Sequence, residues 1–127
     1  MLKLICLYTD KLFDVFAIEF DGKCLIKDFI DGLLDSDKRK ITKLLEFTAR
    51  NGTPKNTEKF HQLYCKEMDI YEFKQKPYRI LCTIQDRKII LSHCFHKPKR
   101  RQLEREINKA VGLFKQYFEG HQNEKGK

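Results

Sequence analysis

The sequence predicts an α+β fold: an antiparallel β-sheet packed by a helical hairpin near the N-terminus, with a C-terminal helix. Two observations predict this class. Apolar residues recur at helical spacing in the segments 25–51 and 102–118, whereas the other segments are rich in β-branched and aromatic residues. Several strand-like runs also follow one another with short connections, which favours antiparallel pairing. We expect one domain over residues 1–119 and a polar tail over residues 120–127.

The first residues predict a strand that ends in a tight turn. Leu12–Phe20 alternates apolar and polar side chains toward its end and runs into Asp21-Gly22, a common turn dipeptide. Leu2–Tyr8 is a candidate partner strand, joined through Thr9–Lys11. The sequence alone does not decide whether these two strands pair as a hairpin.

The next segment predicts two helices. Leu25, Phe29 and Leu33 lie four residues apart and begin an apolar stripe. Asp35-Ser36-Asp37 interrupts it and offers capping side chains for a second helix, which ends at Asn51-Gly52. Because the connection is short, the two helices should form a helical hairpin.

The second half predicts up to four strands and a final helix. The strand candidates are Phe60–Cys65, Ile70–Gln75, Tyr78–Ile84 and Arg87–Phe95, the last two joined by a turn at 85–87. Gln102–Phe118 then returns to helical spacing. We expect helices to cover one face of the sheet and to leave the other face open.

The positive charge is concentrated in one part of the chain. The formal net charge is +8 at pH 7, and the window Lys74–Lys109 alone holds eleven Lys and Arg against three acids. The remaining residues contain equal numbers of basic and acidic side chains. Because the window contains two strand candidates, we expect its cations to lie on the open face of the sheet. A rigid cationic face suits a polyanion, with nucleic acid as the first candidate.

Composition excludes several other classes. No apolar run approaches the roughly 20 residues that cross a bilayer, so no membrane association is expected. The five cysteines include no C-x-x-C pair, which indicates reduced thiols and a cytoplasmic protein. The spacing of His93, Cys94 and His96 fits no standard zinc site, and neither a metal nor another cofactor is expected.

Four stretches, in this order, carry a family resemblance: Ile26–Leu33 with the helix end Leu44–Gly52, Met68–Lys74, Pro77–Leu81, and Ile89–Arg100. They resemble the phage-derived HigB-like branch of the RelE/ParE type II toxin superfamily. That branch shows "y-E-l-r", then "y-R-i-l", then "l-l-H-g-F-x-K-K" before a helix rich in Glu, Arg and Ala. The resemblance covers roughly residues 12–118 and implies a RelE-like fold.

The resemblance also implies a function. Toxins of this kind enter the A site of the 30S ribosomal subunit and cut messenger RNA there as endoribonucleases. The cleavage needs no metal, because the 2′-hydroxyl of the RNA attacks the adjacent phosphate. A cognate antitoxin, often a helix-turn-helix protein, neutralises the toxin. We therefore expect messenger RNA on the ribosome and such an antitoxin as partners.

The motif matches place a candidate catalytic set in the cationic window. Arg79 matches the family's Y-R arginine, whose planar guanidinium suits phosphate. Lys97 and Lys99 belong to the matching basic segment, and His93 and His96 are the local groups that titrate near neutral pH. Alternate residues of a strand face opposite ways, so both histidines share one face only if the strand ends between them. The expected RNA-binding residues are Lys74, Arg100, Arg101, Arg87 and Lys88.

Two departures from the best-studied relatives keep alternatives open. Glu72 stands where those relatives have a lysine, and no tyrosine follows Arg100 within a helical turn. Arg79 could therefore pair with Glu72 across neighbouring strands instead of binding phosphate. The corresponding alternative function is a non-catalytic RelE-fold protein that binds RNA, the ribosome or a partner protein. A DNA-binding regulator ranks last, because no recognition-helix motif is visible.

Overall fold

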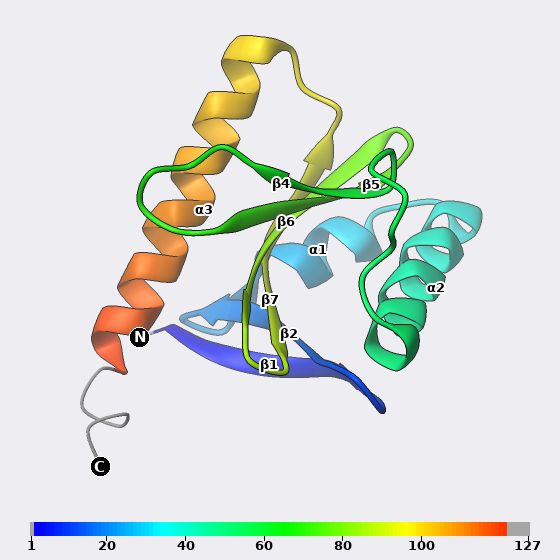
Figure 1. Ribbon diagram of the computed structural model, residues 1–127, viewed down its shortest axis with the longest axis horizontal. Helices are drawn as coiled ribbons and strands as arrows, with labels where there is room; N and C mark the ends of the chain where they lie inside the picture. Colours follow the sequence, from blue (N-terminus) through cyan, green and yellow to red (C-terminus); the bar gives the residue numbers. More distant parts are fainter. Residues whose placement is uncertain (1, 122–127) are drawn as a thin grey trace.

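The computed structural model describes residues 2–121 (Figure 1). The elements are β1 (Leu2–Thr9), β2 (Asp14–Phe20), β3 (Lys23–Cys24), α1 (Leu25–Asp31), α2 (Asp35–Asn51), β4 (Phe60–Leu63), β5 (Ile70–Gln75), β6 (Tyr78–Gln85), β7 (Lys88–His96) and α3 (Arg100–Gly120). The predicted α+β class, the helical hairpin and the C-terminal helix are confirmed. No helix within the described residues is long and apolar enough to span a membrane.

The strands form one mixed sheet in the order β1-β2-β7-β6-β5-β4, and the short β3 pairs with β2. Every pairing is antiparallel except that of β2 with β7, which is parallel. Short connections alone predict a wholly antiparallel sheet. The observed sheet differs from that prediction in the pairing of β2 with β7. The reason is the long connection through α1, α2 and β4–β6, which brings the chain back beside β2 in the same direction.

The candidate N-terminal hairpin is present, and its neighbouring turn has the expected geometry. β1 pairs with β2 over most of its length. At the end of β2, Asp21 and Gly22 have φ angles of 48° and 83°. Two successive positive φ angles are what a two-residue hairpin turn requires, and Gly22 adopts such an angle without steric cost.

Both faces of the sheet are covered. Ile26 of α1 and Ile41 and Leu45 of α2 belong to the hydrophobic core on one face. Ala110, Val111 and Phe114 of α3 belong to the core on the other face. Figure 1 shows α2 and α3 on opposite sides of the strands. The expected open face is therefore wrong, because the apolar stripe of the C-terminal helix needs a sheet face to cover it.

A β-bulge in β7 decides which way its later residues point. Leu81 lies opposite His93 and the next residue, Cys82, lies opposite Leu91, so Ser92 is the extra residue. An extra residue reverses the alternation of side chains along the strand. As a result Phe95 joins the core under α3, whereas Cys94 joins the core under α1 and α2.

Candidate functional site

The turn between β5 and β6, the end of β7 and the start of α3 meet at one end of the sheet. The backbone N–H of Lys97 donates a 2.7 Å hydrogen bond to the carbonyl of Pro77, which ties the β7–α3 segment to the β5–β6 turn. Several basic side chains of the window therefore gather there. We name this region the cationic end and define it by Lys74, Lys76, Lys97, Lys99, Arg100 and Arg101.

Positive charge is concentrated in the first turn of α3, where it destabilises the helix. Lys99 precedes the helix, and Arg100 and Arg101 open it with no acid in the first turn. The positive end of the helix dipole disfavours cations, whereas it favours a bound phosphate. A hollow of about 440 Å³ lies beside this turn and is lined by Lys99, Arg100, Arg101, Gln102 and Arg105. The site is chemically suited to an anion.

Lys74 adds a second unfavourable charge arrangement. It lies directly opposite Arg79 in the β5–β6 pairing, and like charges in that position destabilise a sheet. Within residues 2–121, no carboxylate forms an ion pair with Lys74. An anion placed between the strand ends and α3 would relieve this repulsion.

Arg79 is not exposed at the cationic end. Its side chain is buried, with Nε 3.9 Å from Oε2 of Glu72, and Nη1 donates a 3.0 Å hydrogen bond to the carbonyl of Tyr78. Glu72 is also buried, and its other oxygen lies 2.7 Å from Nε2 of His61. The cross-strand pairing that the sequence left open is therefore present. A phosphate reaches Arg79 only by displacing or joining the Glu72 carboxylate.

His93 is enclosed between β7 and α3. Only 3% of its surface is exposed, Nδ1 lies 2.9 Å from the Ser92 hydroxyl, and Nε2 lies 3.4 Å from Oε1 of Glu106. The Glu106 contact is not aligned as a hydrogen bond, and Nε2 finds no other partner among the described residues. Burial, with a further contribution from Lys109, lowers the pKa of His93 to about 4. The imidazole is therefore neutral at pH 7 and is shielded from an external ligand.

His96 lies on the other face of the sheet and is exposed. Its ring centroid is 5.1 Å from that of Tyr78 and 5.8 Å from that of Phe29 in α1. Both histidines belong to β7, which does not end between them, so the structure does not bring them together. Of the two, His96 is the one that an external ligand can reach.

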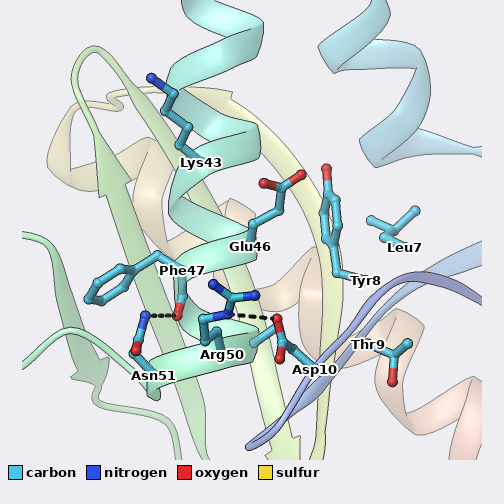
Figure 2. A pocket seen from close by; sticks show the side chains of 10 residues that line it. Leu7, Tyr8, Thr9, Asp10, Lys43, Glu46, Phe47, Arg50 and Asn51 are labelled. Atoms are coloured by element: carbon cyan, nitrogen blue, oxygen red, sulfur yellow. Dashed lines mark hydrogen bonds and ion pairs between the residues drawn. The ribbon is translucent and has the colours of Figure 1, made fainter.

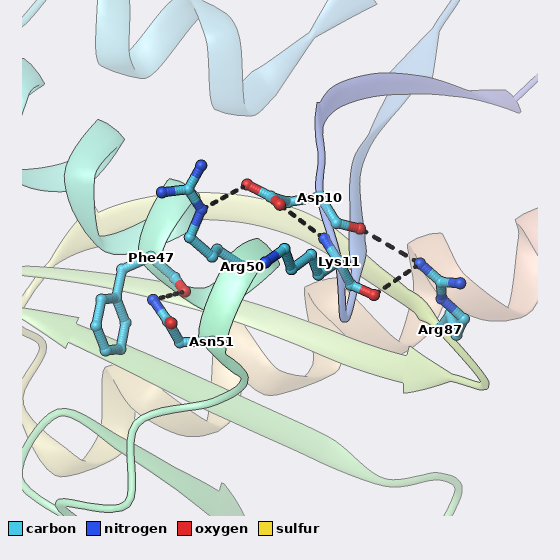
Figure 3. A network of polar contacts seen from close by, with 6 residues as sticks. All are labelled: Asp10, Lys11, Phe47, Arg50, Asn51 and Arg87. Carbon is cyan, nitrogen blue, oxygen red and sulfur yellow. Dashed lines mark hydrogen bonds and ion pairs between the residues drawn. The ribbon is translucent and has the colours of Figure 1, made fainter.

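Arg87 and Lys88 lie at the opposite end of the β6–β7 hairpin and are not part of the cationic end. Nη2 of Arg87 donates hydrogen bonds to the carbonyls of Asp10 (3.3 Å) and Lys11 (3.2 Å) in the β1–β2 turn (Figure 3). Nζ of Lys88 lies 5.9 Å from the centroid of the Phe16 ring. Arg87 thus already has acceptors within the protein.

The described residues hold no group of three or more His, Cys, Asp or Glu side chains placed to bind a metal ion. The side chains that define the cationic end are lysines and arginines. The sequence indicated Glu72 as a departure from a family pattern and as a possible partner of Arg79, but it did not reveal His61 as the second partner of that carboxylate. The only available signal was that His61 and Glu72 both occur in strand-like runs.

A family model described as phage-derived protein Gp49-like (DUF891) matches residues 28–115, which is more than half of the chain. The chain belongs to the Gp49-like family. The match runs from α1 into α3 and includes the cationic end. No curated protein matches the sequence significantly.

This Gp49-like chain also resembles a solved structure. A chain in the crystal structure of the archaeal RelE–RelB complex from Pyrococcus horikoshii OT3 matches with a TM-score of 0.50 at 13% sequence identity. The match covers 58% of this chain and 88% of that chain. At this identity the similarity concerns the fold, and it confirms the RelE-like fold that the motifs predicted.

Proposed function

We propose that this protein is the toxin of a type II toxin–antitoxin pair, of the HigB-like kind, and acts in the cytoplasm as a ribosome-dependent endoribonuclease. Membership of the Gp49-like family and the RelE-like fold support the proposal. The observation that carries it is the cationic end, where exposed Lys and Arg residues surround the start of α3, whose first turn holds no acid. Messenger RNA in the 30S A site is the proposed substrate, and a helix-turn-helix antitoxin is the proposed partner.

The proposed reaction is metal-independent. The 2′-hydroxyl of the RNA attacks the adjacent phosphate, and the 5′ oxygen of the next nucleotide leaves. Lys97, Lys99 and Arg100 would hold the phosphate, with Lys74 beside them. His96 would accept the 2′ proton, and its imidazolium would return a proton to the leaving oxygen. Arg79 would stabilise the pentavalent phosphate after Glu72 is displaced, a type of contact that is worth about 3 kcal/mol.

The buried groups favour a second candidate, a RelE-fold protein that binds RNA, the ribosome or a partner protein without cutting. Glu72 forms an ion pair with Arg79, and His93 is neutral and buried. Neither Arg79 nor His93 is placed to act on a ligand at the surface without rearrangement. A protein with these groups would use its cationic end for binding alone.

Mapping messenger 5′ ends in cells separates the two functions. The wild type, Arg79→Ala and His96→Gln would each be induced from the same promoter, with Arg87→Ala as the control for loss of an arginine elsewhere. Growth arrest with codon-phased cuts that persist in the control and disappear in the other two variants supports the endoribonuclease. Arrest without cuts, or unimpaired growth of the wild-type strain, contradicts the endoribonuclease and supports the binding protein.

A further inference from the structure

A groove with an apolar floor lies between α2 and the segment that follows it. Its volume is about 520 Å³, and Leu44, Phe47 and Pro54 form its floor. The Phe47 side chain is 54% exposed, although it belongs to an amphipathic helix whose opposite face is buried. Figure 2 shows Phe47 pointing away from Tyr8 and Asp10, on the opposite side of α2. An exposed aromatic ring in a concave apolar surface is typical of a docking site.

The charged side chains that line this groove are all cationic. Its charged lining residues are Lys40, Lys43, Lys55 and Lys59, with no acid among the lining. All four lysines are exposed, and within residues 2–121 none forms an ion pair. By contrast, the neighbouring pocket of about 590 Å³, which shares Lys43 and Phe47 with the groove, includes Glu46 and an Asp10–Arg50 ion pair at 3.2 Å. The charge of the groove is therefore uncompensated.

These features fit a peptide better than a nucleic acid. A floor of Leu44, Phe47 and Pro54 accommodates aliphatic side chains, whereas only the amides of Asn56 and Gln75 offer neutral polar groups for base edges. The lining also contains no arginine, the residue most suited to bidentate phosphate contacts. An amphipathic helix binds such a groove through apolar anchors at i, i+3 or i+4, and i+7. Acidic residues flanking those anchors would meet the lysines.

We propose that this groove docks an acidic amphipathic helix of a partner protein. Apolar side chains of the partner would contact Leu44, Phe47 and Pro54, and its carboxylates would contact the four lysines. The proposal is independent of the toxin function, because none of the residues that define the cationic end lines the groove.

Selection from a displayed peptide library tests the proposal. Random peptides of about 16 residues, roughly four helical turns, would be selected on the immobilised full chain, and the enriched peptides would be measured by fluorescence anisotropy. The groove variants are Lys40→Glu/Lys43→Glu and Phe47→Ala. The matched control is Lys23→Glu/Lys27→Glu, which makes the same charge change at exposed residues of β3 and α1 outside the groove. Circular dichroism would verify that each variant folds.

The enriched peptides should be acidic, with apolar residues at helical spacing. The double charge reversal should weaken their binding by about tenfold or more and Phe47→Ala by about fivefold, while the control changes it less than about twofold. Failure to enrich acidic peptides, or binding that survives the charge reversal, overturns the proposal. It is also overturned if the charge reversal weakens an oligouridylate of about 12 nucleotides as strongly as the peptides, because the groove would then bind nucleic acid.

Discussion

The two ends of the β6–β7 hairpin are both basic, but the arginine at the turn already donates to acceptors within the protein. At the turn, Arg87 donates to two backbone carbonyls and holds the β1–β2 turn. At the cationic end, Lys97, Lys99 and Arg100 are exposed around the start of α3. We therefore expect the acceptors already present in the protein, and not the number of cations alone, to determine which basic segment binds a polyanion.

Arg79 is the exception at the cationic end, and removing its partner should have the largest effect. Glu72→Ala leaves a buried guanidinium without a carboxylate, so the free energy of unfolding should fall by about 3 kcal/mol. Urea denaturation measures this change. Replacing both residues with methionine should recover much of the loss. A loss below about 1 kcal/mol for Glu72→Ala would show that Arg79 reaches water and belongs with the exposed cations.

The two histidines of β7 provide a pH test of the difference between buried and exposed groups. Because the folded-state pKa of His93 is lowered to about 4, the unfolded chain binds a proton at a higher pH than the folded chain does. Stability is therefore fully present above about pH 6.5 and falls as the pH drops toward 4, by up to about 3 kcal/mol. The nearby Glu106 carboxylate opposes this effect, so the figure is an upper value.

Urea unfolding at several pH values between 7 and 4 would measure that dependence. His93→Gln should remove most of the His93 contribution, because glutamine does not titrate. His96→Gln is the matched control and should keep the wild-type slope, since that side chain is exposed. Equal slopes for wild type and His93→Gln would contradict the assignment of His93 as a buried neutral group.

RNA binding should distinguish the two ends directly. If Lys97, Lys99 and Arg100 each contact a phosphate, their combined replacement by alanine should reduce the log–log salt slope of oligouridylate binding by about 2. Filter binding at several salt concentrations measures the slope. Arg87→Ala/Lys88→Ala should leave it nearly unchanged. A similar reduction in both variants would mean that the field of the whole window, and not the cationic end, binds RNA.

The smallest expected effect is structural and concerns the turn. Arg87→Ala removes two hydrogen bonds at an exposed site, so the free energy of unfolding should decrease by about 1 kcal/mol. Thermal or urea unfolding measures it. Arg87→Lys should recover only part of the loss, because an ammonium group cannot reproduce the fork of the guanidinium. No change in either variant would indicate that the contact with the β1–β2 turn contributes nothing to stability.

Much of the fold could be predicted because its signals are local. The stripe that begins at Leu25, the break at Asp35-Ser36-Asp37 and the turn at Asp21-Gly22 each depend on neighbouring residues. The parallel pairing of β2 with β7 could not be predicted in this way, because it joins strands separated by six other elements. The covering of the second sheet face by α3 was missed for a similar reason: an amphipathic stripe shows that a helix needs a partner, but not which face it takes.

The features of the candidate site also fall into two groups: those that the sequence determined and those that only the tertiary structure decided. The sequence by itself determined the concentration of charge in Lys74–Lys109 and the basic segment before α3. Only the tertiary structure decided that Glu72 pairs with Arg79, that Arg87 lies at the far end of its hairpin, and that the bulge at Ser92 turns His93 toward α3 and His96 toward α1. Charge and periodicity are properties of a segment, whereas burial and pairing depend on which distant segment is folded against it.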